Sequence, residues 1–412
     1  MTGPPVEQRT SAGVLVRLCV MMLLQFGAFG AWFATLGLVL ATHQLPMIIG
    51  AAYGLGSLAS LFSPMVLGAL ADRFFASEKV LAASHIVCAG LMFLLPRFVD
   101  AADPTATLWL IFLYMLAFQP TLALTNNIAF RHLGTDSQRY PYIRVFGTLG
   151  WIIAGLAVGT LAWSASTMIF TFSSIVSVAL AAYALTLPHT PPAGRGARFK
   201  LGDLIGREAF VLFRQRNFIV FSIVALLIGC CLGAYNAYGS PFLGALGMGQ
   251  VASVLVIGPL SEIIFIVSIP FVLKRFGLKW ALLTGMLAWA IRFVFFMIAT
   301  GGQSGWMFAG IALHGVCNDF FLVLGAMYLD QITQANLKAQ GQSLFQVIFM
   351  GLGGFLGANI VGVVFNNSMA VDQSLAAWIP VWGVPAALAG AAALIWVLFF
   401  NPRRHQADIA AA

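Results

Sequence analysis

Twelve long apolar stretches run through the sequence and constrain its fold more than any other feature. A helix that crosses a bilayer needs roughly 20 consecutive apolar residues. Hydrophobic residues make up 60% of the 412 positions and charged residues only 8%, whereas soluble domains are about a quarter charged. The chain is therefore predicted to be an all-α integral membrane protein. The predicted spans are 15–41, 46–71, 79–97, 107–132, 143–163, 166–187, 216–240, 249–273, 279–299, 305–330, 340–364 and 377–400.

One polar segment, 188–215, interrupts this pattern and is rich in proline and basic residues. It predicts a linker between an N-terminal half of six helices (1–187) and a C-terminal half of six helices that ends in a short tail (216–412). Apart from Arg97 and Arg292, the Lys and Arg residues lie in the termini, the linker, alternate loops or the bordering helix ends. Excess positive charge marks cytoplasmic loops, so both termini and the linker are predicted to be cytoplasmic. The same rule explains the net charge of +8 without a nucleic-acid partner.

Patterns typical of other protein classes are missing from the sequence. All five cysteines fall within apolar stretches, so we expect buried thiols and neither disulfides nor a metal site. Intramembrane enzymes need a nucleophile and base or a set of metal ligands, and the sequence has no HExxH or GxSxG motif. We therefore expect no catalytic residues, metal or cofactor. The first apolar run is too long for a cleaved signal peptide and is expected to remain as a span.

Four ionisable residues that lie inside the predicted spans or at their edges are candidates for a functional role. Glu262 and Asp319 fall near the middle of the eighth and tenth spans, Arg292 lies in the ninth, and Arg144 opens the fifth. Ionisable residues at such depth usually mark ion or substrate paths. Burial and a neighbouring arginine act on a carboxyl group in opposite senses, and a balance between them allows proton exchange. We therefore predict proton coupling by Glu262 and Asp319. Arg292 is expected to face one or both acids in a structural ion pair, and a direct role in transport is the alternative.

Uncharged polar and aromatic residues also occur within the spans. Asn236, Asn126, Trp32 and Trp151 are predicted to line a cavity, because amides and aromatic rings suit a neutral solute with many hydrogen-bonding groups. The alternative is that the amides bond across helices and the tryptophans fill volume. His314, which lies four residues before Asn318, is expected to serve in packing.

The turn after the second span reads Gly68-x-x-Ala71-Asp72-Arg73 and is echoed by a basic turn after the eighth span. This turn resembles the signature loop of the major facilitator superfamily, whose members have two related six-helix halves. The resemblance implies twelve transmembrane helices in that fold and a gating role for Asp72 and Arg73. A solvated charged turn is the simpler alternative.

Motifs along nearly the whole chain resemble the bacterial nucleoside:proton symporters of this superfamily. The resemblance implies that nucleoside is held between the halves and that four residues take part: Arg144, Asn236, Glu262 and Asp319. It rests on Trp32-Phe33-Ala34-Thr35-Leu36-Gly37, Asp72-Arg73-Phe74, Pro120-Thr121 with Asn126, Arg144-Val145-Phe146-Gly147-Thr148-Leu149-Gly150, Ser261-Glu262 with Pro270, Arg292-Phe293, and Gly315 with Asp319-Phe320.

Two positions depart from the pattern of that family. Its members carry a glutamine three residues before the glutamate of the eighth helix, where this chain has Pro259, and another three residues before the asparagine of the seventh, where it has Gly233. In that family, those amides are expected to recognise the solute through hydrogen bonds. The two departures therefore bear on the choice of cargo and leave the predicted proton machinery unchanged.

The function predicted from the sequence is proton-coupled import of a nucleoside-like solute by alternating access. The expected partners are protons, a small neutral polar solute and the lipid of a bacterial inner membrane, with the chain acting as a monomer. A second hypothesis keeps the fold and changes the cargo to a sugar, a polyol or an exported drug-like compound. A third, a membrane enzyme or sensor that does not transport, lacks both a reaction motif and an appended soluble domain.

Overall fold

The computed structural model describes residues 10–63, 75–192, 207–335 and 337–402, and within these ranges the regular structure is entirely helical. Eight described helical segments are long and apolar enough to cross a membrane, and three shorter apolar ones accompany them. The all-α membrane fold predicted from the sequence is therefore confirmed. The contacts between residues divide the chain into two compact units. Unit 1 comprises Met1–Ala34 and Phe62–Phe199, and unit 2 comprises Thr35–Leu61 and Lys200–Ala412.

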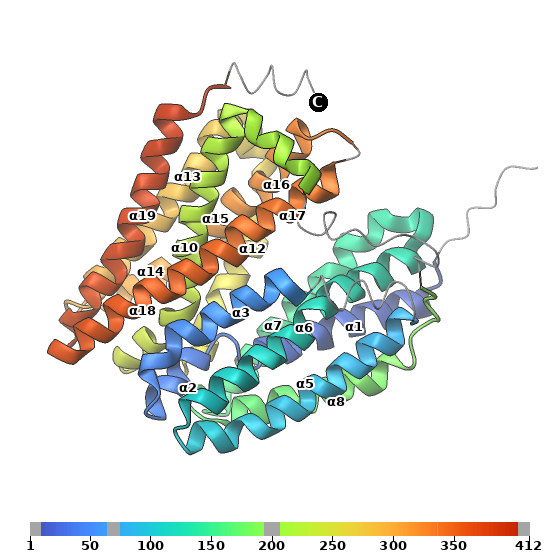
Figure 1. The fold of residues 1–412 in the computed structure, drawn as a ribbon, viewed down its shortest axis with the longest axis horizontal. Helices are drawn as coiled ribbons and strands as arrows, with labels where there is room; N and C mark the ends of the chain where they lie inside the picture. Colours follow the sequence, from blue (N-terminus) through green and yellow to red (C-terminus); the bar gives the residue numbers. More distant parts are fainter. Residues whose placement is uncertain (1–9, 64–74, 193–206, 336, 403–412) are drawn as a thin grey trace, which may run out of the picture. The chain divides into compact units, whose positions relative to one another are not determined.

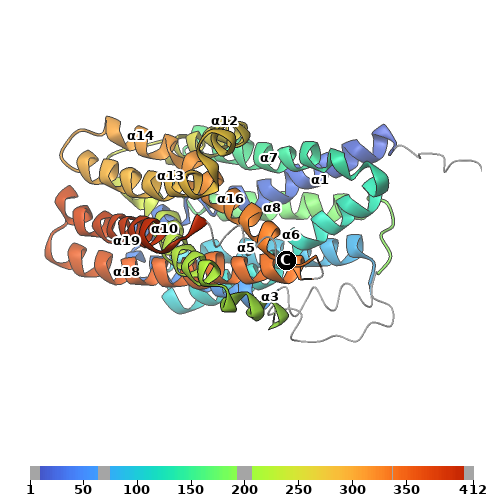
Figure 2. The same cartoon turned by 90° about the horizontal axis from the view of Figure 1, so that it is seen from above.

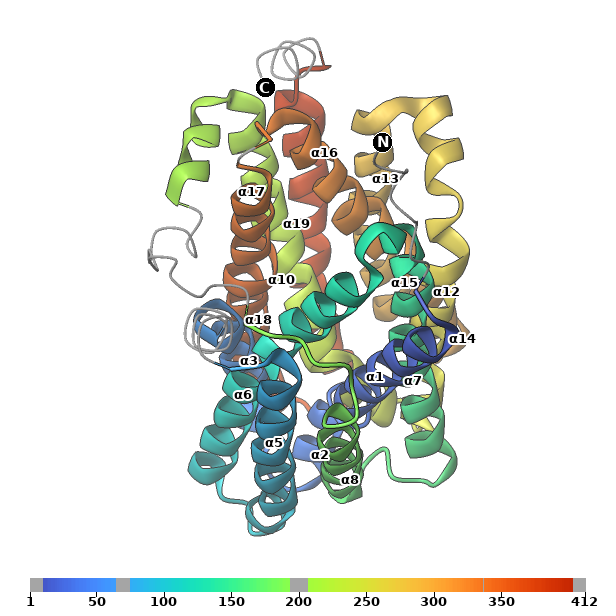
Figure 3. The ribbon, with the colours of Figure 1, turned by 90° about the vertical axis from the view of Figure 1, so that its right-hand side faces the viewer.

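Unit 1 is a bundle of long apolar helices around a shared core. Its core gathers buried side chains from all five main helices, including Met22, Leu81, Ile128 and Leu180. Small residues let α1 and α7 lie against each other (Figure 3), because a Cβ atom on Gly30 would come within 3.0 Å of the Trp151 backbone. The elements are α1 (Ala12–Gly30), α5 (Ser77–Asp100), α6 (Pro104–Leu133), η3 (Gly134–Arg139), α7 (Tyr140–Thr160) and α8 (Met168–Ala184).

Unit 2 holds the remaining helices, and α10, α18 and α19 lie side by side within it (Figures 1 and 2). The first elements are α2 (Leu36–Thr42), η1 (Pro46–Ile48), α3 (Ile49–Ser63), η4 (Arg207–Arg214), α10 (Arg216–Ala245), α11 (Val251–Leu255), α12 (Ile257–Ile266) and α13 (Ile269–Ala299). The others are α14 (Gly305–Ala312), α15 (His314–Asn318), η5 (Asp319–Val323), α16 (Leu324–Ile332), α17 (Lys338–Gln346), η6 (Val347–Gly353), α18 (Gly354–Val371), η7 (Leu375–Ala377) and α19 (Trp378–Phe399).

The first predicted span, 15–41, is not one helix. Residues 31–35 form a turn that separates α1 from α2. The chain after this turn packs with unit 2: a Cβ atom on Gly50 would lie 2.6 Å from the Ala358 carbonyl oxygen, and one on Gly37 would clash with the Ala237 carbonyl oxygen. Contacts therefore group residues 35–61 with the C-terminal helices, whereas the predicted division into halves 1–187 and 216–412 follows chain order and stays a prediction.

The eighth and ninth predicted spans are also divided differently from the prediction. The span 249–273 consists of α11, α12 and the first residues of α13, with a short break at 267–268. α13 continues through Gly277, whose φ of 73° and ψ of 170° mark the turn between the two predicted spans. A positive φ of this size favours glycine, which has no Cβ atom.

Hydrogen bonds attach the start of the predicted linker 188–215 to α5 of unit 1. The buried Glu78 carboxylate, at the start of α5, accepts hydrogen bonds from His189 Nδ1 at 2.9 Å and from the Thr190 backbone N–H at 3.0 Å. The Ser77 N–H in turn donates to the Thr190 carbonyl at 3.0 Å. Asp72 and Arg73, the predicted gating pair, lie outside the described residues, so their role stays a prediction.

Close helix packing at glycine leads to a stability prediction. A Cβ atom on Gly357 of α18 would lie 2.5 Å from the Cys230 Cα atom of α10, whereas a Cβ atom on Gly390 of α19 would meet nothing within 4 Å. We expect Gly357→Ala to destabilise the protein by roughly 1–3 kcal/mol, the typical cost of overpacking. A thermal-unfolding measurement in detergent should show a lower midpoint for Gly357→Ala and an almost unchanged one for Gly390→Ala. Equal midpoints for the two variants would contradict this account of the packing.

Candidate functional site

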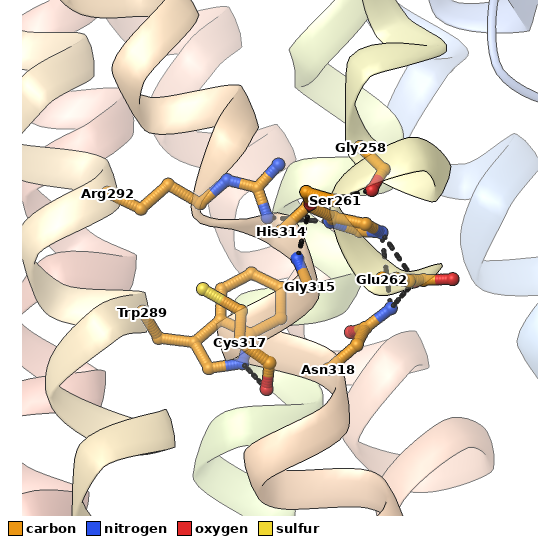
Figure 4. A network of polar contacts seen from close by, with 9 residues as sticks. All are labelled: Gly258, Ser261, Glu262, Trp289, Arg292, His314, Gly315, Cys317 and Asn318. Atoms are coloured by element: carbon orange, nitrogen blue, oxygen red, sulfur yellow. Dashed lines mark hydrogen bonds and ion pairs between the residues drawn. The ribbon is translucent and has the colours of Figure 1, made fainter. Parts of the chain in front are cut away.

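The candidate site lies in unit 2 and centres on Glu262 of α12 (Figure 4). Its Oε1 atom accepts a hydrogen bond of 2.7 Å from Asn318 Nδ2 and lies 3.2 Å from His314 Nε2. His314 and Asn318 are four residues apart on α15, a spacing that places two side chains on one face of a helix. The Glu262 side chain keeps 30% of its surface exposed. The acid that stood out in the sequence is thus partly accessible and is held by two polar neighbours.

Arg292 of α13 forms the buried end of the same network. It is 0% exposed, and its Nη1 atom lies 2.9 Å from His314 Nδ1. Its guanidinium carbon lies 3.4 Å from the centre of the Tyr235 ring, which is a cation–π contact. The sequence analysis expected Arg292 to face an acid. The structure instead connects Arg292 to Glu262 through His314, and within the described part of the chain Arg292 forms no ion pair with a carboxylate.

His314 is the residue whose role the sequence analysis missed. It was expected to serve only in packing, and the structure corrects this: both of its ring nitrogens have polar partners, Arg292 on one side and Glu262 with Asn318 on the other. The four-residue spacing of His314 and Asn318 was the available signal. It shows that the two share a helical face but does not reveal which side chains of other helices meet that face.

A close contact between α12 and α15 brings these groups together. Ser261 Oγ donates to the Gly258 carbonyl oxygen at 2.7 Å and accepts from the Gly315 N–H at 2.8 Å. A Cβ atom on Gly315 would lie 2.5 Å from the Ser261 carbonyl oxygen, so only glycine fits. The contact places Glu262, which follows Ser261, beside the residues that flank Gly315.

Asp319, the second predicted carboxyl, directly follows Asn318 but does not join the network described above. It begins η5, a π-helical stretch, and such stretches are frequent at functional sites. Its side chain is buried at 5% exposure, and Oδ2 has no hydrogen-bond partner among the described residues. An unpaired buried carboxylate is costly, so the position is compatible with a group that changes its protonation.

Asn236 and Gly233 lie on α10. Asn236 is half-buried and follows Tyr235, the residue that stacks on Arg292. A Cβ atom on Gly233 would lie 2.9 Å from the Gly354 Cα atom. A glutamine at position 233 would therefore collide with the neighbouring backbone, and its absence reflects close packing of α10 against the start of α18. Pro259 stands in the first turn of α12, three residues before Glu262.

The remaining predicted site residues belong to unit 1. The Arg144 guanidinium carbon lies 4.1 Å from the centre of the Phe26 ring, so α7 meets α1 through a cation–π contact. The Asn126 Oδ1 atom accepts a hydrogen bond of 2.7 Å from the Tyr140 hydroxyl. Both side chains thus have partners within their own unit.

The two predicted tryptophans, Trp32 and Trp151, differ in their surroundings. Trp32 is 1% exposed and meets the Tyr114 ring edge to face at 5.1 Å. Trp151 is half-buried and lies edge to face with Phe29 at 5.5 Å. In this conformation Trp32 is part of an aromatic core, whereas Trp151 keeps part of its surface accessible.

A second buried polar cluster in unit 1 contains a histidine that the sequence analysis did not single out. His85 Nε2 lies 2.9 Å from Gln25 Oε1, and Gln25 Nε2 donates to Thr121 Oγ1 at 2.7 Å. All three side chains are fully buried. The cluster joins α1, α5 and α6 and satisfies polar atoms that would otherwise be costly in an apolar bundle.

Comparison with known proteins identifies the family. A family model described as "Nucleoside H+ symporter" matches residues 12–405. The chain belongs to the nucleoside H+ symporter family. Xanthosine permease of Escherichia coli (strain K12) is 32% identical over 413 residues, covering 96% of this chain and 97% of that protein. Nucleoside permease NupG of the same organism is 29% identical over 404 residues, covering 94% and 96%.

Structural comparison agrees with this assignment to the nucleoside H+ symporter family. A crystal structure of the nucleoside transporter NupG matches with a TM-score of 0.84 at 28% identity, covering 94% of this chain and 99% of that one. The major facilitator superfamily fold and the resemblance to nucleoside:proton symporters, both predicted from sequence motifs, are thereby confirmed.

The joint between α12 and α15 leads to a prediction for its serine. Ser261→Ala removes the acceptor of the buried Gly315 N–H, and an unsatisfied buried donor costs about 1–3 kcal/mol. Ser268 is a matched control, because its hydroxyl makes the same type of bond to the carbonyl three residues earlier and, among the described residues, no hydrogen bond to another helix. Thermal unfolding should show a clearly lower midpoint for Ser261→Ala than for Ser268→Ala. The reverse order would contradict the role given to Ser261.

Proposed function

We propose that this protein imports nucleosides together with protons by alternating access. We place it as a monomer in a bacterial inner membrane with both termini in the cytoplasm, as the distribution of basic residues suggests. The family match over residues 12–405 supports symport, and the names of the relatives, xanthosine permease and nucleoside permease, point to nucleosides as cargo. The observation that carries the proposal is the polar network around Glu262 within otherwise apolar helices.

We assign the transported proton to Glu262. Its carboxylate accepts a hydrogen bond from the amide of Asn318 and lies beside the imidazole of His314. Since the side chain is also 30% exposed, a proton can reach it. Asp319 is the second candidate, because it is buried at 5% exposure and has an oxygen without a hydrogen-bond partner among the described residues.

We propose that amides, aromatic rings and the ionisable residues bind and recognise the solute. Asn236 and Asn126 offer amide groups, and Trp151 offers an aromatic face for a nucleobase. Arg144, Glu262 and Asp319 supply charged partners for hydroxyl groups or base edges. Trp32, because it is buried, contributes by shaping the aromatic cluster that surrounds it.

Coupling follows if only two states of the transporter convert easily between outward and inward access: the state with no cargo and the state with both. A protonated Glu262 without solute, and bound solute beside an ionised Glu262, then do not convert, which prevents the passage of either cargo alone. Such rocking of two parts around a central site is the general mechanism of this architecture. Asp72 and Arg73 are proposed to contribute to the cytoplasmic gate.

A second candidate, a sugar or polyol carried by the same fold, is favoured by one observation. The position of Gly233 has no room for an amide, because Gly354 packs against it. A site without this amide can form fewer hydrogen bonds to a nucleobase. Competition of labelled uridine by unlabelled nucleosides and by unlabelled sugars in proteoliposomes separates the two cargoes, since only the true class of substrate competes.

Replacement of Glu262 tests proton coupling. In proteoliposomes with an imposed pH gradient, we expect Glu262→Gln to lose concentrative uridine uptake, because the amide cannot take up and release a proton. Exchange of external for internal uridine needs no net proton movement and should persist. Glu78→Gln is the matched control, since it makes the same substitution at a buried carboxylate of unit 1. Concentrative uptake by Glu262→Gln at the level of the unmodified protein would refute the assignment.

A further inference from the structure

We propose that Gln119 of α6 binds the cargo and recognises the edge of a nucleobase at which a carbonyl group and an N–H group are adjacent. The proposal rests on the proposed function, the transport of nucleosides. It adds a residue to that function and names the part of the cargo that this residue contacts. All the residues that support it belong to unit 1.

Gln119 stands in the middle of a membrane-spanning helix. α6 is 30 residues long, and Gln119 lies at its midpoint. The side chain is half-buried, and its amide forms no hydrogen bond with any of the residues that the structure describes. An amide that faces hydrocarbon without a hydrogen-bond partner is costly. Gln119 is therefore expected to face water or a polar ligand, at the depth where transporters of this architecture hold their cargo.

The accessible side chains of α6 change in character near Gln119. In the first half of the helix the large accessible side chains are apolar, with Trp109 at 58% and Leu113 at 44% exposure. In the second half the accessible side chains include the half-buried amides of Gln119, Asn126 and Asn127. Gln119 and Asn126 are seven residues apart and hence share one face of the helix. Amides therefore continue from the middle of α6 toward the end predicted to be cytoplasmic, as expected for a helix that borders a water-filled path.

The turn of α6 that carries Gln119 is fixed by its neighbours. Thr121 Oγ1 donates to the Phe118 carbonyl oxygen at 2.5 Å and accepts a hydrogen bond of 2.7 Å from Gln25 Nε2 of α1. Phe118 and Thr121 are both 0% exposed. The residues on either side of Gln119 thus belong to the core of unit 1, and they hold the Gln119 backbone at a defined position.

Aromatic rings lie beside this turn. The Phe29 ring stacks on the Phe118 ring at 4.8 Å between centroids and meets the Trp151 ring edge to face at 5.5 Å. Phe29 and Trp151 are half-buried, and Phe118 directly precedes Gln119. Gln119 therefore adjoins the aromatic group that contains Trp151, the ring proposed to stack on a nucleobase. Unstacked bases are commonly recognised by an aromatic ring on their face and a polar group at their edge.

The chemistry of the Gln119 amide favours one edge of the cargo. A glutamine side chain has a carbonyl oxygen that accepts and an NH₂ group that donates hydrogen bonds. It can therefore bind an adjacent N–H and C=O of a base at the same time, and amide side chains make such paired contacts to bases in nucleic acids. The rings of uracil and xanthine both offer this edge. The paired hydroxyl groups of ribose are the competing partner, and the position beside the aromatic rings favours the base.

The test replaces the amide of Gln119 and measures uridine uptake in proteoliposomes. Gln119→Leu keeps most of the side-chain volume and removes both hydrogen-bonding groups. We expect the KM for uridine to rise about 3–10-fold, as the net strength of a hydrogen bond implies. The pH dependence of uptake should not change, because an amide does not titrate. Leu113→Ala, which shortens an accessible side chain of the same helix, is the control and should keep the KM of the unmodified protein.

Two uridine analogues identify the atoms that Gln119 contacts. In N-methyluridine a methyl group replaces the ring N–H, and in deoxyuridine a hydrogen replaces one ribose hydroxyl group. As unlabelled competitors of labelled uridine, N-methyluridine should be clearly weaker than uridine for the unmodified protein and almost equal to uridine for Gln119→Leu. The strength of deoxyuridine relative to uridine should be the same for both proteins.

Three outcomes would overturn the proposal. The first is an unchanged KM in Gln119→Leu, and the second is the same preference for uridine over N-methyluridine in both proteins. The third is loss of the preference for uridine over deoxyuridine in Gln119→Leu, which would assign Gln119 to the ribose. If instead the unmodified protein takes up no nucleoside, it is the proposed function that fails.

Thiol labelling tests the accessibility of position 119 without relying on uptake. Cys19 is half-buried and the other four cysteines are buried, so Cys19→Ser provides a background with little reaction. In that background, Gln119→Cys should react with a water-soluble maleimide, and uridine should slow the reaction. Uridine should not slow any reaction of Leu113→Cys. No reaction of Gln119→Cys, or a reaction that uridine does not slow, would contradict the proposal.

Discussion

A guanidinium group buried in an apolar bundle must be stabilised by its neighbours. In unit 2, polar and aromatic side chains around Arg292 provide this stabilisation. The Tyr235 ring supports the charge at 3.4 Å, and His314 accepts a hydrogen bond from it at 2.9 Å. This acceptor role leaves the other imidazole nitrogen to donate toward Glu262. A buried charge on α13 is thus linked through a histidine on α15 to the carboxyl on α12.

The network depends on helices that approach more closely than large side chains would allow. Gly258 leaves room for the His314 ring, and Gly315 lets its backbone N–H reach Ser261 Oγ. Apolar helices in lipid gain little from a hydrophobic effect between them, so close packing and interhelical hydrogen bonds hold them together. The same residues that join α12 to α15 therefore also fix the distance between Glu262 and the side chains of His314 and Asn318.

The sequence was sufficient to predict the membrane fold, because hydropathy reports directly on how much apolar surface must be covered by lipid. It also singled out Glu262, Asp319 and Arg292, since a charge in an apolar run is costly wherever it points. It did not reveal that His314 stands between Arg292 and Glu262, because helical spacing gives the face of a residue and not its partner on another helix. The grouping of residues 35–61 with unit 2 likewise depends on packing at Gly37 and Gly50, which is tertiary information.

The central claim is that nucleoside and proton move together and that Glu262 carries the proton. Simultaneous recording of labelled nucleoside uptake and internal pH in proteoliposomes tests it most directly. With no imposed gradient, addition of nucleoside outside should acidify the interior in step with its uptake, and Glu262→Gln should abolish the acidification. Nucleoside uptake with no change of internal pH in the unmodified protein would contradict the account.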